Sequence, residues 1–600
     1  MALTPPAFVA LTKRGATLAR QLQAAFPGSS VHGFARRVES SDVAFDDVAA
    51  HLVMLFMHGT PIVAIAAAGI VIRALASHLD DKRSEPAVLA MAEDGSSIVP
   101  LIGGHRGGNA LARRLAALTG GHAAITTAGD LALGIALDAP PPGWRIATPE
   151  MLKPAAAALI AGDGVALEIE AGGAAWLTAL IPRHATTGIR LVVTTRLDKR
   201  PDALVYHPPR LVLGIGCERD ADPASVLAFV RDGLAKSGFA AGAIACVTSI
   251  DLKLDEAAVH EVATALDVPA RFFSAAELAA YEARLATPSS YVKTVVGVAG
   301  VAEAAALAGA GAHATLVLTK QIGPRATLAL AQAPHDIDPA RIGRARGKLD
   351  IVGIGPGLAA WRTPEASEAL LGADDVVGYG LYLDLLGKLI AGKRQHIGAL
   401  GEEEARVKLA LDLAAQGKRV ALVSSGDAGI YAVATLVHEL VERGDDPLWR
   451  RIAIATLPGV SAMQAAAARA GAPLGHDFCA ISLSDLLTPL ADIECRLQAA
   501  LAGDFVIALY NPASLRRRVP LERAVTLLRK GRKPATPVVI ARNLGRADES
   551  VRVVTLAALD PEEIDMLTIM IVGSSATRRG PSGVFTPRGY AQKPRSDATP

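Results

Sequence analysis

The sequence of 600 residues is poor in aromatic residues and in cysteine. Phe, Trp and Tyr make up only 4% of the chain, and no basic run or RNA-binding aromatic motif occurs. Because the formal net charge is only +2, the composition gives no electrostatic basis for binding nucleic acid. The cysteines are far apart and form no CxxC pair: Cys217, Cys246, Cys479 and Cys495. This spacing argues against a disulfide framework and a metal site, and it suits a reducing cytoplasm.

The chain also lacks a recognisable signal peptide and an unbroken membrane span. Its start, MALTPPAFVALTKRG, has neither a basic n-region nor a long apolar core. Residues 52–72 contain no Asp, Glu, Lys or Arg and are just long enough to cross a bilayer, but the sequence His58-Gly59-Thr60-Pro61 interrupts them. We interpret this segment as a buried strand at 52–57, a turn, and an alanine-rich helix ending near Arg73. We therefore expect a cytoplasmic protein without a membrane partner.

Residues 349–379 form the most informative stretch of the chain. A short apolar run at 349–354 predicts a buried parallel strand. The strand runs into three glycines, which allow positive φ and close approach of the backbone to a ligand: Gly353, Gly355 and Gly357. Thr363 and Pro364 then have the pattern of a helix N-cap followed by proline at the first helical position. The stretch therefore predicts strand, glycine turn, loop and helix.

This glycine turn differs from the common nucleotide-binding motifs. In a dinucleotide fingerprint the helix begins at the glycines, whereas here it begins six residues after Gly357, and Pro356 lies inside the turn. No Gly-Lys-Ser/Thr follows, which excludes a Walker loop. A nicotinamide-dependent oxidoreductase built on this turn remains one hypothesis, and binding of NADH would favour it.

The pattern of strand, glycine loop and helix recurs in the first half of the chain, as at residues 98–118. This repetition predicts α/β units with parallel sheets. Three consecutive prolines at 140–142 indicate a boundary, and residues 333–348 combine prolines and charges without apolar periodicity, which is typical of a linker.

Several motifs of the first half resemble the cobalt-precorrin-5A hydrolase family of cobalamin biosynthesis. GTPIVAIAAAGIVIRALASHL, PLIGGHRGGNALARRLA and AAITTAGD resemble its N-terminal domain. ARFFSAAEL, PSSYVKTVVGVAGVAEAAAL and LVLTKQIGPRATLALA, within residues 208–333, resemble its C-terminal domain, which also exists as a free-standing protein. The resemblance implies opening of a lactone on the corrin precursor with release of a two-carbon fragment. The alternative is a non-catalytic corrin-binding module.

His105 is the candidate general base for lactone opening, because it lies in a glycine-rich loop beyond a strand. The alternative is that it only hydrogen-bonds the loop or a substrate carboxylate. The family's loop reads GHxGGAN, and here GHRGGN is one residue shorter. The third segment has four polar signals, Lys253, Glu256, Glu303 and Lys320. Its lysines could anchor substrate carboxylates, and the alternative is that these residues form surface salt pairs. Cys217 could be a nucleophile, but no partner histidine is identifiable, and we interpret it as an ordinary buried cysteine.

A series of motifs over residues 349–590 resembles the S-adenosylmethionine-dependent tetrapyrrole methyltransferases. The series runs through SSGDAGIY, TLPGVSA, LGHDFCAISLSDLLTP, ALYNPASLRRR, VVIARNLGR and IDMLTIMIVGSSATR. The LGHDFCAISLSDLLTP and ALYNP segments are similar to those of the precorrin-3B C(17)-methyltransferases. This resemblance implies methylation of precorrin-3B at C-17 with ring contraction, which gives precorrin-4. The sequence leaves open whether the substrate already contains cobalt.

The resemblance also implies the site residues. The segments that contact S-adenosyl-L-methionine in the family contain Pro356, Gly426, Asp427, Ser461, Ala462, Tyr510 and Thr568. Asp427 could hydrogen-bond a polar group of the cofactor, and the alternative is a structural capping role. The implied substrate-binding residues are Gly355, Gly357 and Arg516, and the alternative for Arg516 is a solvated basic turn. Ring contraction needs a base, for which Asp485 or His476 is the candidate; the alternative for His476 is a structural pair with Asp477. The first turn of the family usually reads GxGPGD, and in this chain Leu358 stands in place of the aspartate. In the second turn Ala428 stands in place of a usual proline.

These patterns predict an α/β protein in which parallel-sheet domains of the hydrolase type precede a two-domain, tapered methyltransferase. The expected segments are a hydrolase-like N-terminal domain, a middle module, a hydrolase-like C-terminal domain, a linker and the methyltransferase, at 1–139, 140–207, 208–333, 334–348 and 349–590. The expected partners are a small tetrapyrrole and, through the methyltransferase half, a second copy of the chain.

Overall fold

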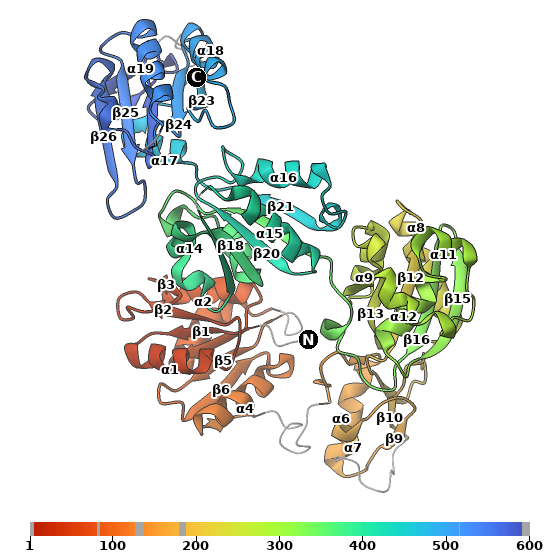
Figure 1. Ribbon diagram of the computed structural model, residues 1–600. Helices are drawn as coiled ribbons and strands as arrows, with labels where there is room; N and C mark the ends of the chain where they lie inside the picture. Colours follow the sequence, from red (N-terminus) through yellow and green to blue (C-terminus); the bar gives the residue numbers. More distant parts are fainter. Residues whose placement is uncertain are drawn as a thin grey trace, which may run out of the picture. The chain divides into compact units, whose positions relative to one another are not determined.

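The computed structural model describes residues 5–80, 85–126, 137–178, 188–399, 401–514 and 517–590. It divides the chain into two compact units, Met1–Arg346 and Gly347–Pro600 (Figure 1). Both units are built from sheets with helices packed against them, which confirms the predicted α/β class. Most of the sheets are mixed, however, because they contain antiparallel as well as parallel strand pairs.

The first sheet of the first unit has the strand order β3-β2-β1-β4-β5-β6-β7. Its strands are β1 (Ala7–Ala10), β2 (Ser30–Phe34), β3 (Val43–Phe45), β4 (Ile62–Ile65), β5 (Val88–Met91), β6 (Ser97–Ile102) and β7 (His122–Ala123). Its helices are α1 (Lys13–Gln23), α2 (Val48–Met57), α3 (Ala68–Leu75) and α4 (Gly108–Thr119). Only the β5–β6 pair is antiparallel in this sheet.

The strand predicted at residues 52–57 is wrong, because this segment belongs to helix α2. Asp47 caps the helix by accepting a hydrogen bond from the backbone N–H of Ala50. The strand follows the interruption instead, as β4, and α3 comes after it. In an almost wholly apolar run the side-chain period that separates helix from strand is hidden.

A four-stranded sheet of order β8-β11-β10-β9 follows in the chain. It comprises β8 (Arg145–Ile146), β9 (Ala166–Ile169), β10 (Arg190–Val193) and β11 (Ala203–His207), with α6 (Leu152–Ala161) and α7 (Ala175–Thr178). The next sheet has the order β14-β13-β12-β16-β15, with β12 (Leu211–Cys217), β13 (Ile244–Ile250), β14 (Ala270–Phe273), β15 (Thr315–Gly323) and β16 (Ala326–Gln332). Its helices are α8 (Pro223–Ser237), α9 (Ala257–Ala265), α10 (Ala275–Ala279), α11 (Ser290–Val296) and α12 (Val301–Ala310).

The segment expected to be a linker is attached to the first unit. Asp336 accepts hydrogen bonds from Trp144 Nε1 and Arg210 Nε, both at 2.7 Å. Further along, Arg344 pairs with Asp251 and forms a backbone bridge with Phe272. These contacts hold the segment against two sheets of its own unit up to the division at Arg346.

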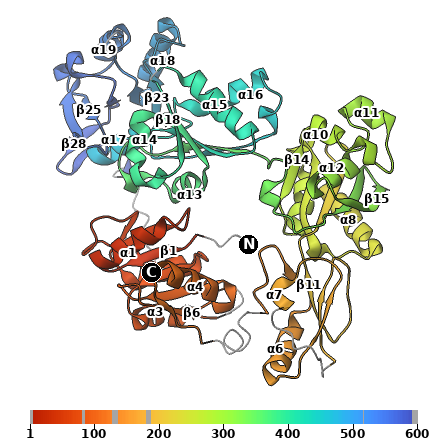
Figure 2. The same ribbon diagram turned by 60° about the horizontal axis from the view of Figure 1, so that its bottom comes forward.

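The second unit begins with a parallel sheet of order β19-β18-β20-β17-β21. Its strands are β17 (Lys348–Gly353), β18 (Asp375–Tyr379), β19 (Arg394–Gly398), β20 (Arg419–Ser424) and β21 (Ala453–Leu457). Figure 2 shows helices of this sheet, which are α13 (Pro364–Gly372), α14 (Gly380–Leu386), α15 (Glu403–Ala415) and α16 (Val433–Arg443). Alternate apolar residues of β17 pack on α15 and α16 on one face and on α13 and α14 on the other.

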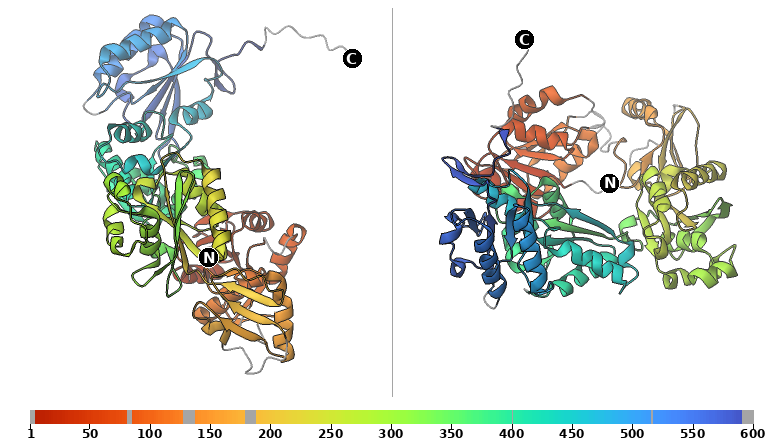
Figure 3. Two further views of the ribbon diagram at one scale, coloured as in Figure 1. Left: turned by 90° about the vertical axis from the view of Figure 1, so that its right-hand side faces the viewer. Right: turned by 90° about the horizontal axis from the view of Figure 1, so that it is seen from above.

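The last large sheet has the order β23-β24-β27-β25-β26. It comprises β23 (Phe478–Ser482), β24 (Val506–Tyr510), β25 (Pro537–Arg542), β26 (Ser550–Thr555) and β27 (Thr568–Val572). Helices α18 (Leu490–Ala502) and α19 (Val519–Gly531) cover one face, and α17 (Ala462–Ala470) covers the other (Figure 3). A small sheet adds β22 (Gly471–Ala472), β28 (Arg578–Gly580) and β29 (Gly583–Phe585).

Within the described ranges, no single helix is both long and apolar enough to span a membrane. The helix pair α11 and α12 passes the length and composition test together, with a bend of 75° between them. Most residues of α12 are buried against the sheet of its own unit.

Candidate functional site

Three glycine turns meet at the carboxyl ends of β17, β20 and β21. The backbone N–H of Gly355 donates to Gly426 O at 3.1 Å, and the N–H of Gly426 donates back to Gly355 O at 2.9 Å. Both glycines have positive φ, 76° and 67°. A Cβ added at Gly459, in the third turn, would lie 2.2 Å from Gly426 O. Side chains are therefore excluded here, and the three turns pack directly against one another, backbone to backbone.

Asp427 ties the second turn to the third. Its Oδ1 accepts from the N–H of Gly429 at 2.8 Å, and its Oδ2 accepts from the N–H of Gly459 at 3.0 Å. Both carboxylate oxygens thus stabilise the turns. This arrangement corresponds to the structural role that the sequence left open for Asp427.

Ser461 and Ala462 lie where the third turn enters helix α17. Ser461 is the buried N-cap, and its hydroxyl accepts from the N–H of Gln464 at 3.2 Å in a capping box. Met463 lies in the first turn of the helix, and its backbone N–H donates to the hydroxyl oxygen of Tyr510 at 3.2 Å. Burial raises the pKa of Tyr510, which keeps its hydroxyl protonated at neutral pH. The predicted cofactor residues of α17 and β24 therefore lie together.

Tyr431 is a residue of this site that the sequence did not single out. It follows the second turn and has a φ of 50°, a rare conformation for a bulky side chain. Its hydroxyl donates to Ala480 O of β23 at 2.7 Å, and its ring centre is 5.3 Å from that of Tyr510. The only signal in the sequence is an aromatic residue at the end of a glycine-rich loop.

The first glycine turn also contacts the second large sheet. A Cβ added at Gly357 would lie 2.6 Å from the carbonyl oxygens of Leu544 and Gly545, in the turn after β25. The buried Pro356 accepts a hydrogen bond from Arg546 Nε at 3.2 Å through its carbonyl oxygen. Two sheets of one unit therefore meet at the predicted cofactor and substrate turn.

Thr568 begins β27 at the same end of the second large sheet. It is paired across the ladder with Arg542 at the end of β25. Its Oγ1 donates to Asp565 Oδ1 at 2.7 Å, and the residue is buried. The hydroxyl is thus engaged within the protein.

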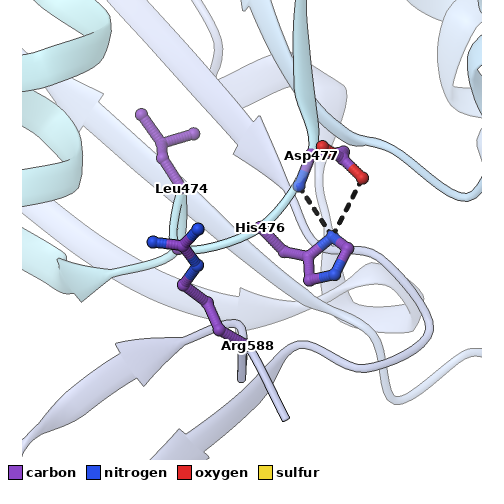
Figure 4. A pocket seen from close by; sticks show the side chains of 5 residues that line it. Leu474, His476, Asp477 and Arg588 are labelled. Atoms are coloured by element: carbon purple, nitrogen blue, oxygen red, sulfur yellow. Dashed lines mark hydrogen bonds and ion pairs between the residues drawn. The ribbon is translucent and has the colours of Figure 1, made fainter. Parts of the chain in front are cut away.

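The two candidate bases lie at opposite ends of strand β23. Asp485 follows the carboxyl end, where its Oδ1 is 3.6 Å from Arg517 Nε. His476 precedes the other end, so the five residues of β23 separate the two by about 16 Å at ~3.3 Å per residue. Figure 4 shows His476 in an exposed pocket with Leu474 and Arg588, where its Nδ1 is 3.2 Å from Asp477 Oδ2. Only Asp485 is on the side of the glycine turns and Tyr510.

Arg516 lies outside the described residues. Its neighbour Arg517 donates to Leu483 O at 2.6 Å and to Asn511 O at 3.2 Å. Arg518 donates to Pro561 O at 2.7 Å. Both described arginines of this turn therefore stabilise the protein itself.

The candidate site residues of the first unit are His105, which lies in a loop, and two buried carboxylates, Glu256 and Glu303. The backbone of His105 lies in a 3-10 turn after β6, between Gly103 and Gly107, which both have positive φ. Buried Glu256 pairs with Lys253 Nζ at 3.2 Å and Arg219 Nη1 at 3.4 Å.

Buried Glu303 accepts from three backbone N–H groups, those of Ala286, Thr287 and Lys320 at 2.9, 3.0 and 2.9 Å. Lys320 Nζ donates to Thr287 O at 2.8 Å. Burial raises the pKa of Cys217 to about 11, which keeps it a thiol. These groups are thus engaged in internal contacts. In the part of the chain that the structure describes, no group of three or more His, Cys, Asp or Glu side chains is arranged to hold a metal ion.

Comparison with known families agrees with this division of the chain. The family model of Tetrapyrrole (Corrin/Porphyrin) Methylases matches residues 348–560. The models Cobalamin synthesis G N-terminal and Cobalamin synthesis G C-terminus match residues 50–130 and 211–331. A precorrin-3B C(17)-methyltransferase from Sinorhizobium sp is 44% identical over 251 residues, which cover 41% of this chain and 98% of that protein. The chain belongs to the tetrapyrrole methylase family. The resemblances drawn from the sequence motifs of both halves are confirmed.

Two further relatives of the tetrapyrrole methylase half differ in name and length. A probable cobalt-factor III C(17)-methyltransferase from Salmonella typhimurium is 46% identical over 243 residues, or 40% of this chain and 99% of that protein. Cobalamin biosynthesis protein CobIJ from Mycobacterium bovis is 45% identical over 261 residues, or 42% of this chain and 50% of that protein. The chain thus spans about half the length of the Mycobacterium relative.

Proposed function

We propose that the second unit methylates precorrin-3B at C-17 with S-adenosyl-L-methionine, with ring contraction to precorrin-4, in cobalamin biosynthesis. The observation that carries this proposal is the match of the second unit to nearly the whole length of a precorrin-3B C(17)-methyltransferase. The glycine turns support it, because Gly355, Gly426 and Gly459 bring three turns together at the carboxyl ends of parallel strands, where open α/β sheets commonly bind ligands.

The residues at the three turns fit a sulfonium cofactor. When bound, S-adenosylmethionine supplies an activated electrophilic methyl group, so the protein mainly has to position it. Backbone groups of the turns and the protonated hydroxyl of Tyr510 offer neutral polar contacts. Asp427 holds the turns in place for this purpose.

Asp485 is the proposed base for the hydroxyl proton that ring contraction removes. It follows β23, and the backbone at the end of that strand pairs with Tyr510 through the N–H of Leu483 at 2.9 Å. A carboxylate positioned beside the reacting groups can accept a proton in this way. His476 lies at the other end of the strand and is proposed to have a structural role.

For the first unit we propose hydrolysis of the lactone on the corrin precursor, with His105 as base. The match of two separate stretches to Cobalamin synthesis G supports this activity. The second candidate is a non-catalytic corrin-binding module. Covalent fusion would raise the effective concentration of a labile intermediate at the next step.

The cobalt-containing precursor is the alternative substrate of the second unit, because a relative of nearly the same coverage is named for cobalt-factor III. We also propose a cytoplasmic homodimer that forms through the second unit. Light scattering after gel filtration of the full chain measures its mass and tests the dimer.

The decisive experiment is mass spectrometry after incubation of the full-length protein with methyl-labelled S-adenosylmethionine. Precorrin-3B and its cobalt-containing counterpart are offered in parallel, and NADH binding is measured separately. A labelled, ring-contracted product from one substrate supports the methyltransferase and selects between the metal-free and cobalt routes. Cofactor binding without label transfer to either compound would overturn the substrate assignment. Binding of NADH without S-adenosylmethionine would overturn the enzyme class.

A further inference from the structure

Arg546 carries a positive charge that no acidic side chain balances among the described residues. It lies in the turn between β25 and β26, and its side chain is half-buried. In the described part of the chain, its side chain makes one hydrogen bond, which Nε donates to the carbonyl oxygen of Pro356 at 3.2 Å. The two Nη groups of its guanidinium are therefore left for another acceptor.

The nearest acids in the sequence are committed to other groups. Glu549 accepts from Arg469 Nε and from the N–H of Gly545, both at 2.7 Å. Asp548 accepts from Asn543 Nδ2 at 2.6 Å and is 3.3 Å from Arg542 Nη1. The turn thus has two carboxylates and still leaves Arg546 unpaired. Because an arginine guanidinium pairs well with carboxylates, its unpaired Nη groups are available to a ligand that carries one.

The surroundings of Arg546 combine positive charge with aromatic rings. Half-buried Tyr382 on α14 packs its ring edge-on against Tyr379, with ring centres 5.3 Å apart. Burial raises the pKa of Tyr382, and the charges of Arg546 and Arg406 act on it in the opposite direction. Arg406 itself is buried and donates to Ala399 O and to Glu403. An aromatic ring within electrostatic range of a guanidinium suits a ligand that combines a flat ring system with acidic substituents.

We infer that Arg546 is an anchor for a side-chain carboxylate of the tetrapyrrole substrate, next to the glycine turn of β17. This inference rests on the proposed function, because it identifies a binding contact within that same site. Its Nε fixes the guanidinium on Pro356 O, and the Nη groups face the carboxylate as a charge-assisted pair. Arg546 lies on the sheet that contains β25 and β26, whereas the glycine turn follows β17 on the other large sheet of this unit. Substrate binding would therefore couple these two sheets.

The test compares full-length variants for two ligands. Uroporphyrin, a stable polycarboxylate tetrapyrrole, is titrated by fluorescence quenching, and S-adenosylhomocysteine is titrated by calorimetry. In Arg546→Met, uroporphyrin should bind about tenfold to a hundredfold more weakly, as expected for loss of a charge-assisted hydrogen bond, with unchanged S-adenosylhomocysteine affinity. Arg546→Lys should lose less. Arg552→Met is the matched control, because Arg552 is an exposed arginine on β26 paired with Glu563.

The outcomes separate this inference from the proposed function. Equal uroporphyrin binding by wild type and Arg546→Met would overturn the anchor. Weaker S-adenosylhomocysteine binding with unchanged uroporphyrin binding would also overturn it, because Arg546 would then only brace the turn. Wild-type protein that binds S-adenosylhomocysteine but no uroporphyrin overturns the anchor while leaving the cofactor class intact. Wild-type protein that binds neither ligand overturns the proposed function itself.

Discussion

The hydroxyl of Tyr431 donates a 2.7 Å hydrogen bond to the carbonyl oxygen of Ala480 and so links the two large sheets of the second unit. Tyr431 adopts a left-handed backbone conformation to do so, which costs about 1–2 kcal/mol for a side chain of this size. Such strain is commonly found at functional sites, where the surrounding structure enforces it. The position beside Tyr510 therefore places Tyr431 at the wall of the proposed cofactor site.

Tyr431→Phe removes this link and keeps the aromatic ring. We expect the unfolding free energy of the second unit to fall by about 1 kcal/mol, the usual net value of one hydrogen bond. S-adenosylhomocysteine binding, measured by calorimetry, should weaken because the two sheets are less firmly held at the site. Tyr590→Phe removes an exposed hydroxyl and serves as control. Equal cofactor affinity in both variants would show that the link is only structural.

Gly459→Ala should disrupt the junction of the three glycine turns. The added Cβ would lie 2.2 Å from Gly426 O and 2.8 Å from Gly353 O, both rigid backbone atoms. We expect a loss of about 1–3 kcal/mol in unfolding free energy, as for other overpacked sites, together with loss of S-adenosylhomocysteine binding. Gly372→Ala at the end of α13 is the control, since its Cβ would meet no atom within 4 Å. Normal melting and binding by Gly459→Ala would contradict the close packing of the turns.

The elements around the first glycine turn could be predicted because their signals are local. Thr363 is the N-cap of α13 and Pro364 its first residue, as the sequence indicates, and β17 ends at the glycines. The helix at Val48–Met57 cannot be predicted in this way, because a uniformly apolar run shows no period and the capping residue, Asp47, lies outside the run.

The composition of the site depends on tertiary structure and could be predicted only in part. His476 and Asp485 are nine residues apart in the chain, yet a complete strand lies between them, which a motif does not reveal. Tyr431 and Arg546 act across the junction of two sheets, so neither has a neighbour in the sequence that identifies it. The glycine turns, by contrast, can be identified from the sequence, because positions with no room for a side chain must be glycine.

The first unit should lose stability in mild acid through a buried histidine pair. His32 Nδ1 is 2.8 Å from His51 Nε2, and His32 Nε2 is 2.7 Å from Ser30 Oγ. Burial, reinforced by the His51 charge, lowers the pKa of His32 to about 4. His32 therefore binds a proton more readily in the unfolded chain than in the folded one. The folded unit keeps its full stability above pH 6.5 and loses stability as the pH falls towards 4.

The expected size of this loss is about 3 kcal/mol across the interval, from the difference between the two pKa values. Thermal melts of the full chain between pH 7 and pH 4 measure it through the transition of the first unit. His32→Gln keeps polar contacts but cannot titrate, so its melting temperature should depend less on pH. A variant as acid-sensitive as wild type would assign the effect to other groups.

Asp485→Asn should abolish most of the methylation and ring contraction while the protein stays folded. The amide keeps the size of the side chain but cannot accept a proton, and loss of a general base lowers kcat by roughly 10²–10⁴-fold. The side chain is one-third exposed and its Arg517 contact is long, so stability should change little. His476→Asn is the control, because that exposed side chain lies at the far end of β23. Turnover measured on precorrin-3B separates the two residues. If only His476→Asn lost activity, Asp485 would not be the base, and the site would have to extend to the other end of β23.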